Sequence, residues 1–489
     1  MNIMLLLHHG WFGATRQSRW SLSRRLLRDT NGTALVLVGL AFTALTGITA
    51  LGVETGLWYA IKRQDQSAAD AAAISGAYER ATGQTYSQIC GQVKHDAATN
   101  GFAFQSYSCP SSSPACTSPS SGQMCANNPP VLGSNAGDDK AVEVILNRQQ
   151  NTYLAKLFLS NVTIGTRAVA KVNLAGIACA GALSTSAAKA VNFSGSSTAD
   201  FSGCGIFSNS NASNAINFQG NTNFTSSWFQ TVGDYNANGN SLNLSVPTRL
   251  TNSSTVTDPY SCNPPAIGCA GTITFTLPAA PTAQTFSTGG TLQPGLYASS
   301  SNKAPMDFTN SNTTYLCPGV YYLDGDANSN GAAFEVHSGA TVNLWQSGNP
   351  GSCPSSGSID GVTIIATSRT GNSGGGFDID SGAVVNLSAP TSSPATGIPS
   401  GILFYQDPSH YDNKGNSTIT ASSASDITKG TLYTPKTNVT FQGNANSTCF
   451  IMIALTLTFS GNSTVSGNSS ACSTAGVTGP TVVNIALTE

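Results

Sequence analysis

Charged side chains are scarce in this sequence. They make up 9% of its 489 residues, against about 25% in an average soluble domain. The formal net charge is −2, and the one basic cluster is a short arginine-rich segment near the start, so nucleic acid is not expected as a partner. Hydrophobic residues still contribute 40%. This excludes intrinsic disorder, because a disordered chain combines low hydrophobicity with high charge.

Several motifs that identify catalytic and metal sites are also missing. The sequence contains no HExxH pair, no Walker-type glycine loop and no metal-binding Asp-x-Ser-x-Ser run. None of its 12 cysteines shows CxxC spacing, which disfavours zinc sites and thioredoxin-like motifs. We therefore expect no enzyme, no metal and no cofactor.

The cysteines all lie after residue 89. Cys109 and Cys116, like Cys262 and Cys269, are seven residues apart among Pro, Ser and Thr, a spacing that suits small disulfide loops. Such usage is typical of an oxidising compartment outside the cytoplasm. The pairings cannot be assigned from the sequence, and scattered buried free thiols are the alternative.

Residues 33–53, TALVLVGLAFTALTGITALGV, form an apolar run without a charge. At about 1.5 Å per residue, a helix of this length spans roughly 30 Å, the thickness of the hydrocarbon core of a bilayer. The predicted anchor residues are Thr33, Leu35, Val36, Leu40, Phe42, Leu45, Ile48, Leu51 and Val53. A cleaved signal peptide, whose apolar region is shorter, and a buried core helix are the alternatives.

The charges that flank the run predict its direction. Arginines precede it at positions 16, 19, 24, 25 and 28, whereas only Lys62 and Arg63 follow it closely. By the positive-inside rule, the N-terminus stays in the cytoplasm and the bulk of the chain crosses the membrane. We expect a single-pass protein of the cytoplasmic membrane with a periplasmic or extracellular C-terminal mass.

Residues 54–80 are predicted to continue the helix beyond the membrane, since the segment is rich in Ala and has no Pro. Trp58 and Tyr59 fall where an aromatic belt belongs. Small residues at helical spacing would let another helix or sheet approach closely. The interface candidates are Trp58, Tyr59, Gln66, Ala68, Asp70 and Ala72. For Asp70, a solvated or helix-pairing carboxylate is favoured over a specific functional role.

The order of these features resembles a known family. A basic RRLLRDTNG, an apolar run, LGVETGLWY, a Lys/Arg pair and QSAADAAAISGA follow one another at tight spacing. This order resembles the N-terminal domain of TadG-like, and more loosely TadE-like, proteins of the Tad/Flp pilus apparatus. The matching positions are Arg24, Arg25, Arg28, Gly32, Gly52, Gly56, Trp58, Tyr59, Gln66, Ala68, Ala69, Asp70, Ala71, Ala72, Ala73 and Gly76.

The resemblance implies a bacterial, membrane-anchored assembly component whose partners are the lipid bilayer and other Tad/Flp subunits. Pilin precursors of the related class are cut after a Gly that a Glu follows five residues later. Here Gly32 is followed by TALVL, and Glu54 lies at the other end of the apolar run. We therefore expect a permanent anchor rather than a released pilus subunit.

A small α+β domain with a pilin-like plan is predicted for residues 81–175. Residues 81–137 are rich in Ser, Pro, Gly and Cys and indicate disulfide-tethered loops. Residues 141–148 and 162–172 alternate as strands do, and residues 152–159 fit a short amphipathic helix.

Residues 176–489 are predicted to form an all-β domain. A β pair joined by a polar turn repeats as VNFSGSSTADF, INFQGNTNFTS, MDFTNSNTTYL, FEVHSGATVNL, FDIDSGAVVNL, VTFQGNANSTC and LTFSGNSTVSG. One such unit cannot bury its apolar face alone, so the units are expected to stack. Asn, Ser and Thr are expected to form hydrogen-bond ladders along the stack. A right-handed parallel β-helix or related β-solenoid is favoured, with a pair of β-sandwiches as the alternative.

Parallel β-helices often carry glycan-cleaving sites, so a surface-anchored glycan-binding or glycan-cleaving protein is the alternative function. The candidate acids are Asp324, Asp326, Asp360, Asp378 and Asp380. The two acids of FDID share one face of a strand, but the equivalent positions of an earlier copy are Glu335 and His337. Such variation indicates an outer face rather than a catalytic pair. Loose candidates for a sugar-binding aromatic platform are Trp228, Trp345, Tyr405 and Tyr411.

Overall fold

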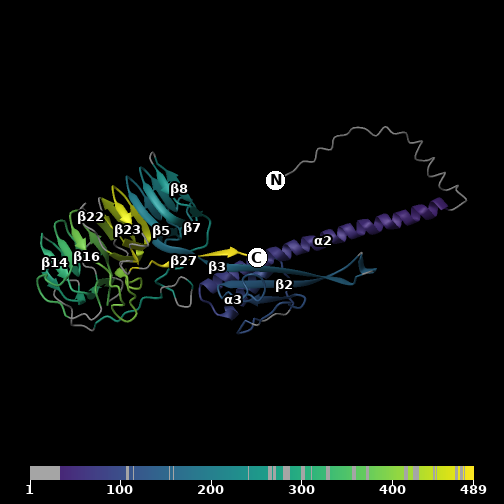
Figure 1. Cartoon of the computed structure of the whole chain (residues 1–489), viewed down its shortest axis with the longest axis horizontal. Coiled ribbons are helices and arrows are strands. Elements are labelled where there is room, and N and C mark those ends of the chain that lie inside the picture. The colour runs from purple at the N-terminus through teal and green to yellow at the C-terminus, as the bar shows by residue number, and fades with distance from the viewer. Residues whose placement is uncertain are drawn as a thin grey trace.

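A computed structural model describes most of residues 33–489 (Figure 1). Outside the described residues lie 1–32, 106–108, 114, 154, 158, 240–241, 263–266, 268–270, 279–286, 299–302, 310, 326–330, 355–358, 370–373, 412–416, 422–428, 444–445, 448, 468–471, 474–476 and 478. The predicted basic segment 1–32, Cys269 and Asp326 therefore fall outside the description. Figure 1 shows a small domain between the strand-rich region at one end and a projecting helix at the other.

The projecting helix is α2 (Thr33–Ala81), which is continuous over 49 residues. Its composition explains this, since it lacks Pro and its second half is dominated by Ala, the strongest helix former. The prediction of one apolar helix that continues past residue 53 is confirmed.

The small domain contains a four-stranded antiparallel sheet in the order β1-β2-β3-β27. Its strands are β1 (Gln123–Asn127), β2 (Ala141–Asn151), β3 (Asn161–Ala182) and β27 (Thr481–Leu487). Alternate residues of β2, namely Val142, Val144 and Leu146, are fully buried in the core that α2 covers. This spacing follows from the two-residue period of a strand.

A second helix, α3 (Tyr86–Thr99), lies within the segment for which only loops were predicted, so that prediction was wrong. The helix buries Ile89, Val93 and Ala97 in the same core as α2. A start signal was present, because the backbone N–H of Thr85 donates to Oε1 of Gln88 at 3.0 Å, as in a capping box. The short helix predicted at 152–159 is a 3₁₀ helix, η1 (Ala155–Leu157).

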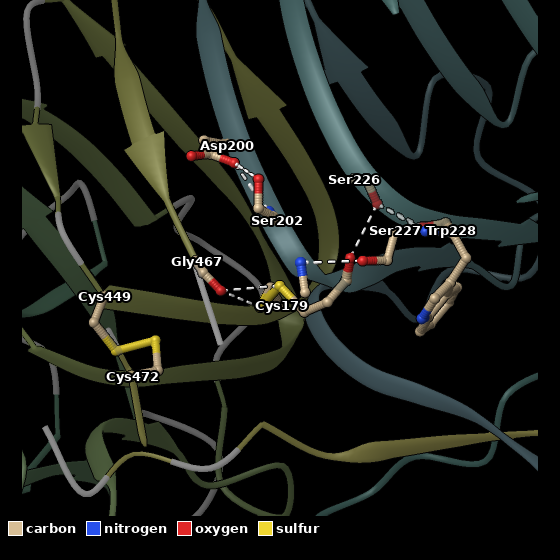
Figure 2. The surroundings of a disulfide bond; sticks show 11 residues. Cys179, Asp200, Ser202, Ser226, Ser227, Trp228, Cys449, Gly467 and Cys472 are labelled. Carbon is tan, nitrogen blue, oxygen red and sulfur yellow. Dashed lines mark hydrogen bonds between the residues drawn. A yellow bond between two sulfur atoms is a disulfide. The ribbon is translucent and has the colours of Figure 1, made fainter. Parts of the chain in front are cut away.

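Disulfide bonds link Cys90 with Cys109, Cys116 with Cys125, Cys179 with Cys204, Cys317 with Cys353, and Cys449 with Cys472. Cys262 is also disulfide-bonded, and no described cysteine is free. The expectation that Cys109 and Cys116 close a small disulfide loop is wrong, because Cys109 pairs with Cys90 and Cys116 with Cys125. Figure 2 shows the Cys179 disulfide, next to which the carbonyl of Gly467 lies.

The C-terminal region is mostly β and has many short strands. They are β4 (Val191–Phe193), β5 (Thr198–Ser208), β6 (Ile216–Gln219), β7 (Asn223–Thr231), β8 (Tyr235–Asn238), β9 (Asn243–Ser245), β10 (Thr248–Leu250), β11 (Gly290–Leu292), β12 (Gly295–Ala298), β13 (Met306–Phe308), β14 (Thr313–Leu316), β15 (Gly319–Asp324), β16 (Ala332–Val336), β17 (Thr341–Leu344), β18 (Val362–Thr367), β19 (Gly376–Ile379), β20 (Val384–Asn386), β21 (Ile402–Gln406), β22 (Ser417–Ala421), β23 (Lys429–Gly443), β24 (Asn446–Ser447), β25 (Cys449–Phe459) and β26 (Thr464–Ser466).

These strands form parallel series. One series runs β13-β16-β19-β22-β23-β25-β4-β6-β8. A second runs β12-β15-β18-β21-β23-β25-β3-β5-β7-β10. Shorter series are β11-β14-β17-β20 and β24-β26-β5-β7-β9.

The repeated units meet in register within the first series. Phe193 pairs with Phe218 and also with Phe459, and the ring centroids lie 5.2 and 4.7 Å apart. Outside this aromatic stack, Asn217 donates to Asn192 at 2.8 Å and accepts from Asn236 at 3.0 Å. The predicted side-chain ladder is confirmed at these asparagines.

The strand-rich region is inserted into the sheet of the small domain. β3 begins in the antiparallel sheet and ends in the parallel series, so it is continuous across residue 175, where the sequence placed a boundary. After β26, the chain returns as β27 and pairs antiparallel with β3. In Figure 1, β27 leads from the strand-rich region to the small domain. Two strands therefore join the two parts.

Candidate functional site

The first half of α2 exposes an unbroken apolar surface. Phe42 and Ile48 are each 71% exposed, and the other predicted anchor residues whose side chains are described are exposed by more than half. By length and composition, α2 can cross a membrane. The hydroxyls of Thr43, Thr46 and Thr49 donate to carbonyls four residues earlier at 2.7–2.8 Å. They therefore need no water, as a bilayer requires.

The predicted aromatic belt follows directly. Tyr59 is 66% exposed, whereas Trp58 is half-buried. Lys62 and Arg63 are exposed about one turn further along the same helix. Aromatic rings followed by cations are the usual order where a membrane helix enters water.

Glu54, the first residue after the apolar run, is 3% exposed. Its carboxylate accepts the backbone N–H groups of Tyr153 at 2.7 Å and of Ala155 at 2.6 Å. These groups belong to the tip of the β2–β3 hairpin, which runs beside α2 in Figure 1. In the sequence, Glu54 stands out only as an acid at the wrong end of the apolar run for pilin processing, and nothing in the spacing of residues 54 and 153 indicates this contact.

The small-residue face of α2 packs against this chain's own domain. Ala68 and Ala72 are fully buried in the core beneath the sheet. Gln66 donates to Oδ1 of Asp70 and to the carbonyl of Arg167, both at 2.8 Å. The close approach predicted for this face is made intramolecularly. Residues of the same chain therefore cover Ala68 and Ala72.

A buried ion pair that the sequence did not reveal holds α2 to β2. Nη2 of Arg148 lies 2.7 Å from Oδ1 of Asp65, whose side chain is 1% exposed. Burial raises the pKa of Asp65, and Arg148 opposes this shift. The guanidinium of Arg148 also lies 5.3 Å from the ring centroid of Phe102.

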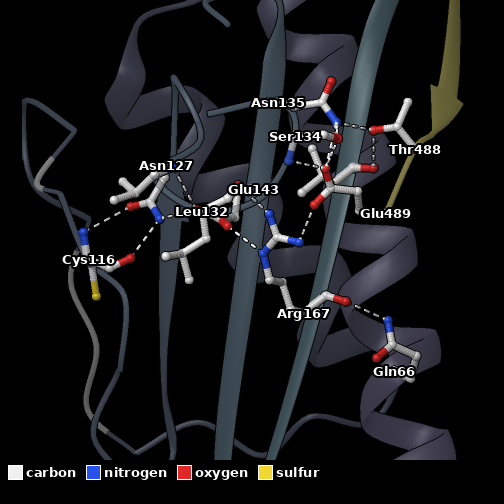
Figure 3. A network of polar contacts seen from close by, with 12 residues as sticks. Gln66, Cys116, Asn127, Leu132, Ser134, Asn135, Glu143, Arg167, Thr488 and Glu489 are labelled. Carbon is white, nitrogen blue, oxygen red and sulfur yellow. Dashed lines mark hydrogen bonds and ion pairs between the residues drawn. The ribbon is translucent and has the colours of Figure 1, made fainter. Parts of the chain in front are cut away.

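A second polar network lies in the small domain, around Arg167 of β3 and the residues that follow β27 (Figure 3). Nε of Arg167 is 2.6 Å from Oε1 of Glu143, which is fully buried, and Nη1 pairs with Glu489. Oε2 of Glu143 accepts from Asn127 at 2.7 Å. Hydrogen bonds from Ser134, and then the pair with Arg167, lower the pKa of Glu489 to about 2.

An open groove of about 820 Å³ lies beside α2. Its lining comprises Ala71, Ile74, Ser75, Tyr78 and Glu79 of α2, Gln92 and Asp96 of α3, residues 252–254, and Asn484 and Ile485. Ile74 is 42% exposed and Tyr78 37%. Burial, and then the charge of Asp96, raises the pKa of Glu79. The groove thus combines apolar side chains with two neighbouring acids.

The candidate acids of the strand-rich region fall into separate places. Asp324 pairs with Arg369, and Asp360 accepts from Thr391 at 2.6 Å. The acids of FDID join a cluster on three successive paired strands, because Asp307 pairs with Glu335 and Glu335 with Asp378.

His337 lies at the centre of this cluster. Its Nε2 is 3.1 Å from Asp307 and 3.6 Å from Glu335, and its Nδ1 is 3.0 Å from Asp380. Burial, and then the charges of Asp380 and Glu335, raises the pKa of Asp378 to about 6. Asp307, Glu335 and His337 are close enough to ligate a metal ion. Burial lowers the pKa of His337, but the charges of Glu335, Asp307 and Asp380 outweigh it and raise the pKa.

The proposed aromatic platform does not form. Trp228 is 5% and Tyr405 4% exposed, and both belong to a buried cluster. Trp345 and Tyr411 are half-buried. Two of the four rings therefore cannot stack on a surface sugar.

Comparison with protein families gives a match over the N-terminal helix. Residues 32–79 match the family model Tad, described as Flp pilus-assembly TadE/G-like. The match begins at the start of α2 and ends in its last turn, so it covers the apolar surface, the belt and the groove-lining face. No curated protein and no solved structure matches the chain.

Proposed function

We propose that this chain is a non-enzymatic structural or assembly component of a Tad/Flp-type pilus system. It is anchored in the bacterial cytoplasmic membrane by the first half of α2 and faces the envelope. The observation that carries the proposal is the coincidence of the family match with a single helix. That helix has one apolar, uncovered half and one half packed under a domain.

Two arguments support the proposed topology, one from charge and one from redox chemistry. The arginine-rich segment before α2 favours a cytoplasmic N-terminus. Disulfides throughout the described C-terminal mass fit an oxidising compartment beyond the membrane. Both arguments give the same orientation independently.

The strand-rich region is, in this proposal, a β-solenoid that projects from the membrane. Support comes from the parallel series and from repeated units stacked in register. All pairings between described strands from β4 to β26 are parallel, whereas sandwiches are built from antiparallel sheets. Such a solenoid supplies a stiff, weakly charged body for wall contact or adhesion.

The groove beside α2 is the surface we assign to other pilus-assembly subunits. The α2 residues that line it belong to the matched segment, and Ile74 and Tyr78 offer exposed apolar contacts there. Single-helix subunits anchored in the same membrane would present their own helices at the same distance from the membrane as this groove. Rim acids at Glu79 and Asp96 would favour a partner with a basic edge.

A photo-crosslinking amino acid at Ile74 tests this role in cells. We expect a covalent adduct with another Tad/Flp subunit, identified by mass spectrometry, and none from the control position Leu132, which is 38% exposed outside the groove. Normal membrane levels of the Ile74 variant without any pilus-subunit adduct would contradict the assembly role.

The alternative is a surface-anchored glycan-binding or glycan-cleaving protein. The His337 cluster with Asp378 is the observation that favours it. Retention on purified cell wall that is lost in Asp378→Asn, together with released sugar, would support this reading over the assembly role.

A further inference from the structure

The tip of the β2–β3 hairpin carries exposed apolar side chains beside the membrane helix. Tyr153 is 69% exposed and Leu159 51%. Lys156 is exposed between them on η1. A backbone bond from Leu159 to Ala155 at 2.9 Å gives the tip a defined shape.

The contact with Glu54 fixes the height of this tip. Residue 53 ends the apolar run, and the carboxylate of Glu54 accepts two backbone N–H groups of the tip. The tip therefore lies within about one helical turn of the point where the apolar run ends.

We propose that this tip is a second membrane contact, made by Tyr153, Lys156 and Leu159, that inserts Tyr153 and Leu159 into the lipid interface. The inference rests on the proposed anchoring of α2. An aromatic ring, an aliphatic side chain and a lysine form the usual composition of an interfacial anchor. Lys156 reaches the lipid phosphates while its stem stays among apolar groups.

The role of Glu54 in this arrangement is positional. A carboxylate at the edge of the hydrocarbon is costly unless it is hydrogen-bonded. The N–H groups of Tyr153 and Ala155 satisfy it and in return hold the tip against α2. Two contacts, one through α2 and one through the tip, restrict how the small domain can tilt on the membrane. They thereby set the direction in which the strand-rich region projects.

The test uses the full chain in nanodiscs of phosphatidylcholine and phosphatidylglycerol. An environment-sensitive fluorophore is attached to a single added cysteine at Tyr153 or Leu159, without reductant, since the described native cysteines are bonded. Labels at Leu45, within the apolar run, and at Leu132 are controls. Lipids with nitroxides at shallow or deep positions serve as quenchers.

Labels at 153 and 159 should emit at shorter wavelength and be quenched by the shallow nitroxides. The label at 45 should be quenched by the deep nitroxides, and the label at 132 by neither. Glu54→Ala should abolish quenching at 153 and leave the Leu45 signal intact, whereas Glu79→Ala, on the same helix, should change neither. If 45 is quenched but 153 and 159 are not, the anchor stands and the tip contact is wrong. If 45 is not quenched, the anchoring itself fails.

Discussion

Arg167 on β3 and Glu489, just beyond β27, form an ion pair across 322 positions of the sequence. The pair lies just past the end of the β3–β27 pairing, beyond Ala170 and Leu487, within the small domain (Figure 3). The same guanidinium contacts the buried carboxylate of Glu143. One side chain therefore ties the returning strand to the core over which α2 packs.

Arg167→Ala is expected to destabilise the small domain by about 3 kcal/mol, because it leaves the buried charge of Glu143 without its cation. Arg80→Ala is the matched control. Its partner Asp139 is 72% exposed, and such a pair contributes about 1 kcal/mol or less. Chemical denaturation of the detergent-solubilised chain measures both. Equal losses in the two variants would contradict the role assigned to Arg167.

The pH dependence of stability should contain a contribution from Glu489. Its pKa falls from 4.5 to about 2 in the folded chain, so the folded state favours the carboxylate. This contribution is complete above pH 4.5 and disappears as pH falls through about 2. The difference in melting temperature between the wild type and Glu489→Gln should be constant at neutral pH and shrink below pH 4.5. A difference that grows on acidification would refute this assignment.

Disulfide connectivity is open to direct mapping. Non-reducing digestion followed by mass spectrometry should find Cys90 linked to Cys109 and Cys116 linked to Cys125. Replacing both Cys179 and Cys204 with Ser should lower the free energy of unfolding of the strand-rich region by about 3 kcal/mol, as expected for a loop of this size. A link between Cys109 and Cys116 would show that the arrangement of α3 is wrong.

Two helical glycines should respond oppositely to Ala. At Gly76 an added Cβ would lie 2.7 Å from Cγ2 of Val93 and 2.9 Å from Cγ1 of Val142, both buried. Gly76→Ala should therefore cost about 1–3 kcal/mol. At Gly91 a Cβ meets nothing within 4 Å, so Gly91→Ala should gain about 1 kcal/mol or less. Thermal unfolding distinguishes them, and stabilisation by Gly76→Ala would contradict the packing of α2 on α3 and β2.

Local sequence signals predicted the helix and the repeats well. The apolar run and the Ala-rich segment specify α2, and the repeated VNF, INF and LTF units place Phe193, Phe218 and Phe459 on neighbouring strands. Both signals work because they depend on nearby residues with a fixed period.

Long-range pairing was not predictable in the same way. Nothing local indicates that Leu457 pairs with Val191, or that β27 returns to β3. Helix α3 was missed because Ser-, Pro- and Cys-rich flanks dominated the composition, although Thr85 and Gln88 had the spacing of a capping box. The contact between Glu54 and Tyr153 also joins residues far apart in the sequence, and only the folded chain shows it.

Membrane topology is the central claim, and protease accessibility in spheroplasts tests it most directly. An antibody to the strand-rich region reports its digestion, and a cytoplasmic protein serves as the protected control. We expect digestion only after the outer envelope is opened, with the α2 fragment retained in the membrane fraction. A strand-rich region that stays protected in spheroplasts and is digested only after lysis would contradict the anchored, envelope-facing assignment.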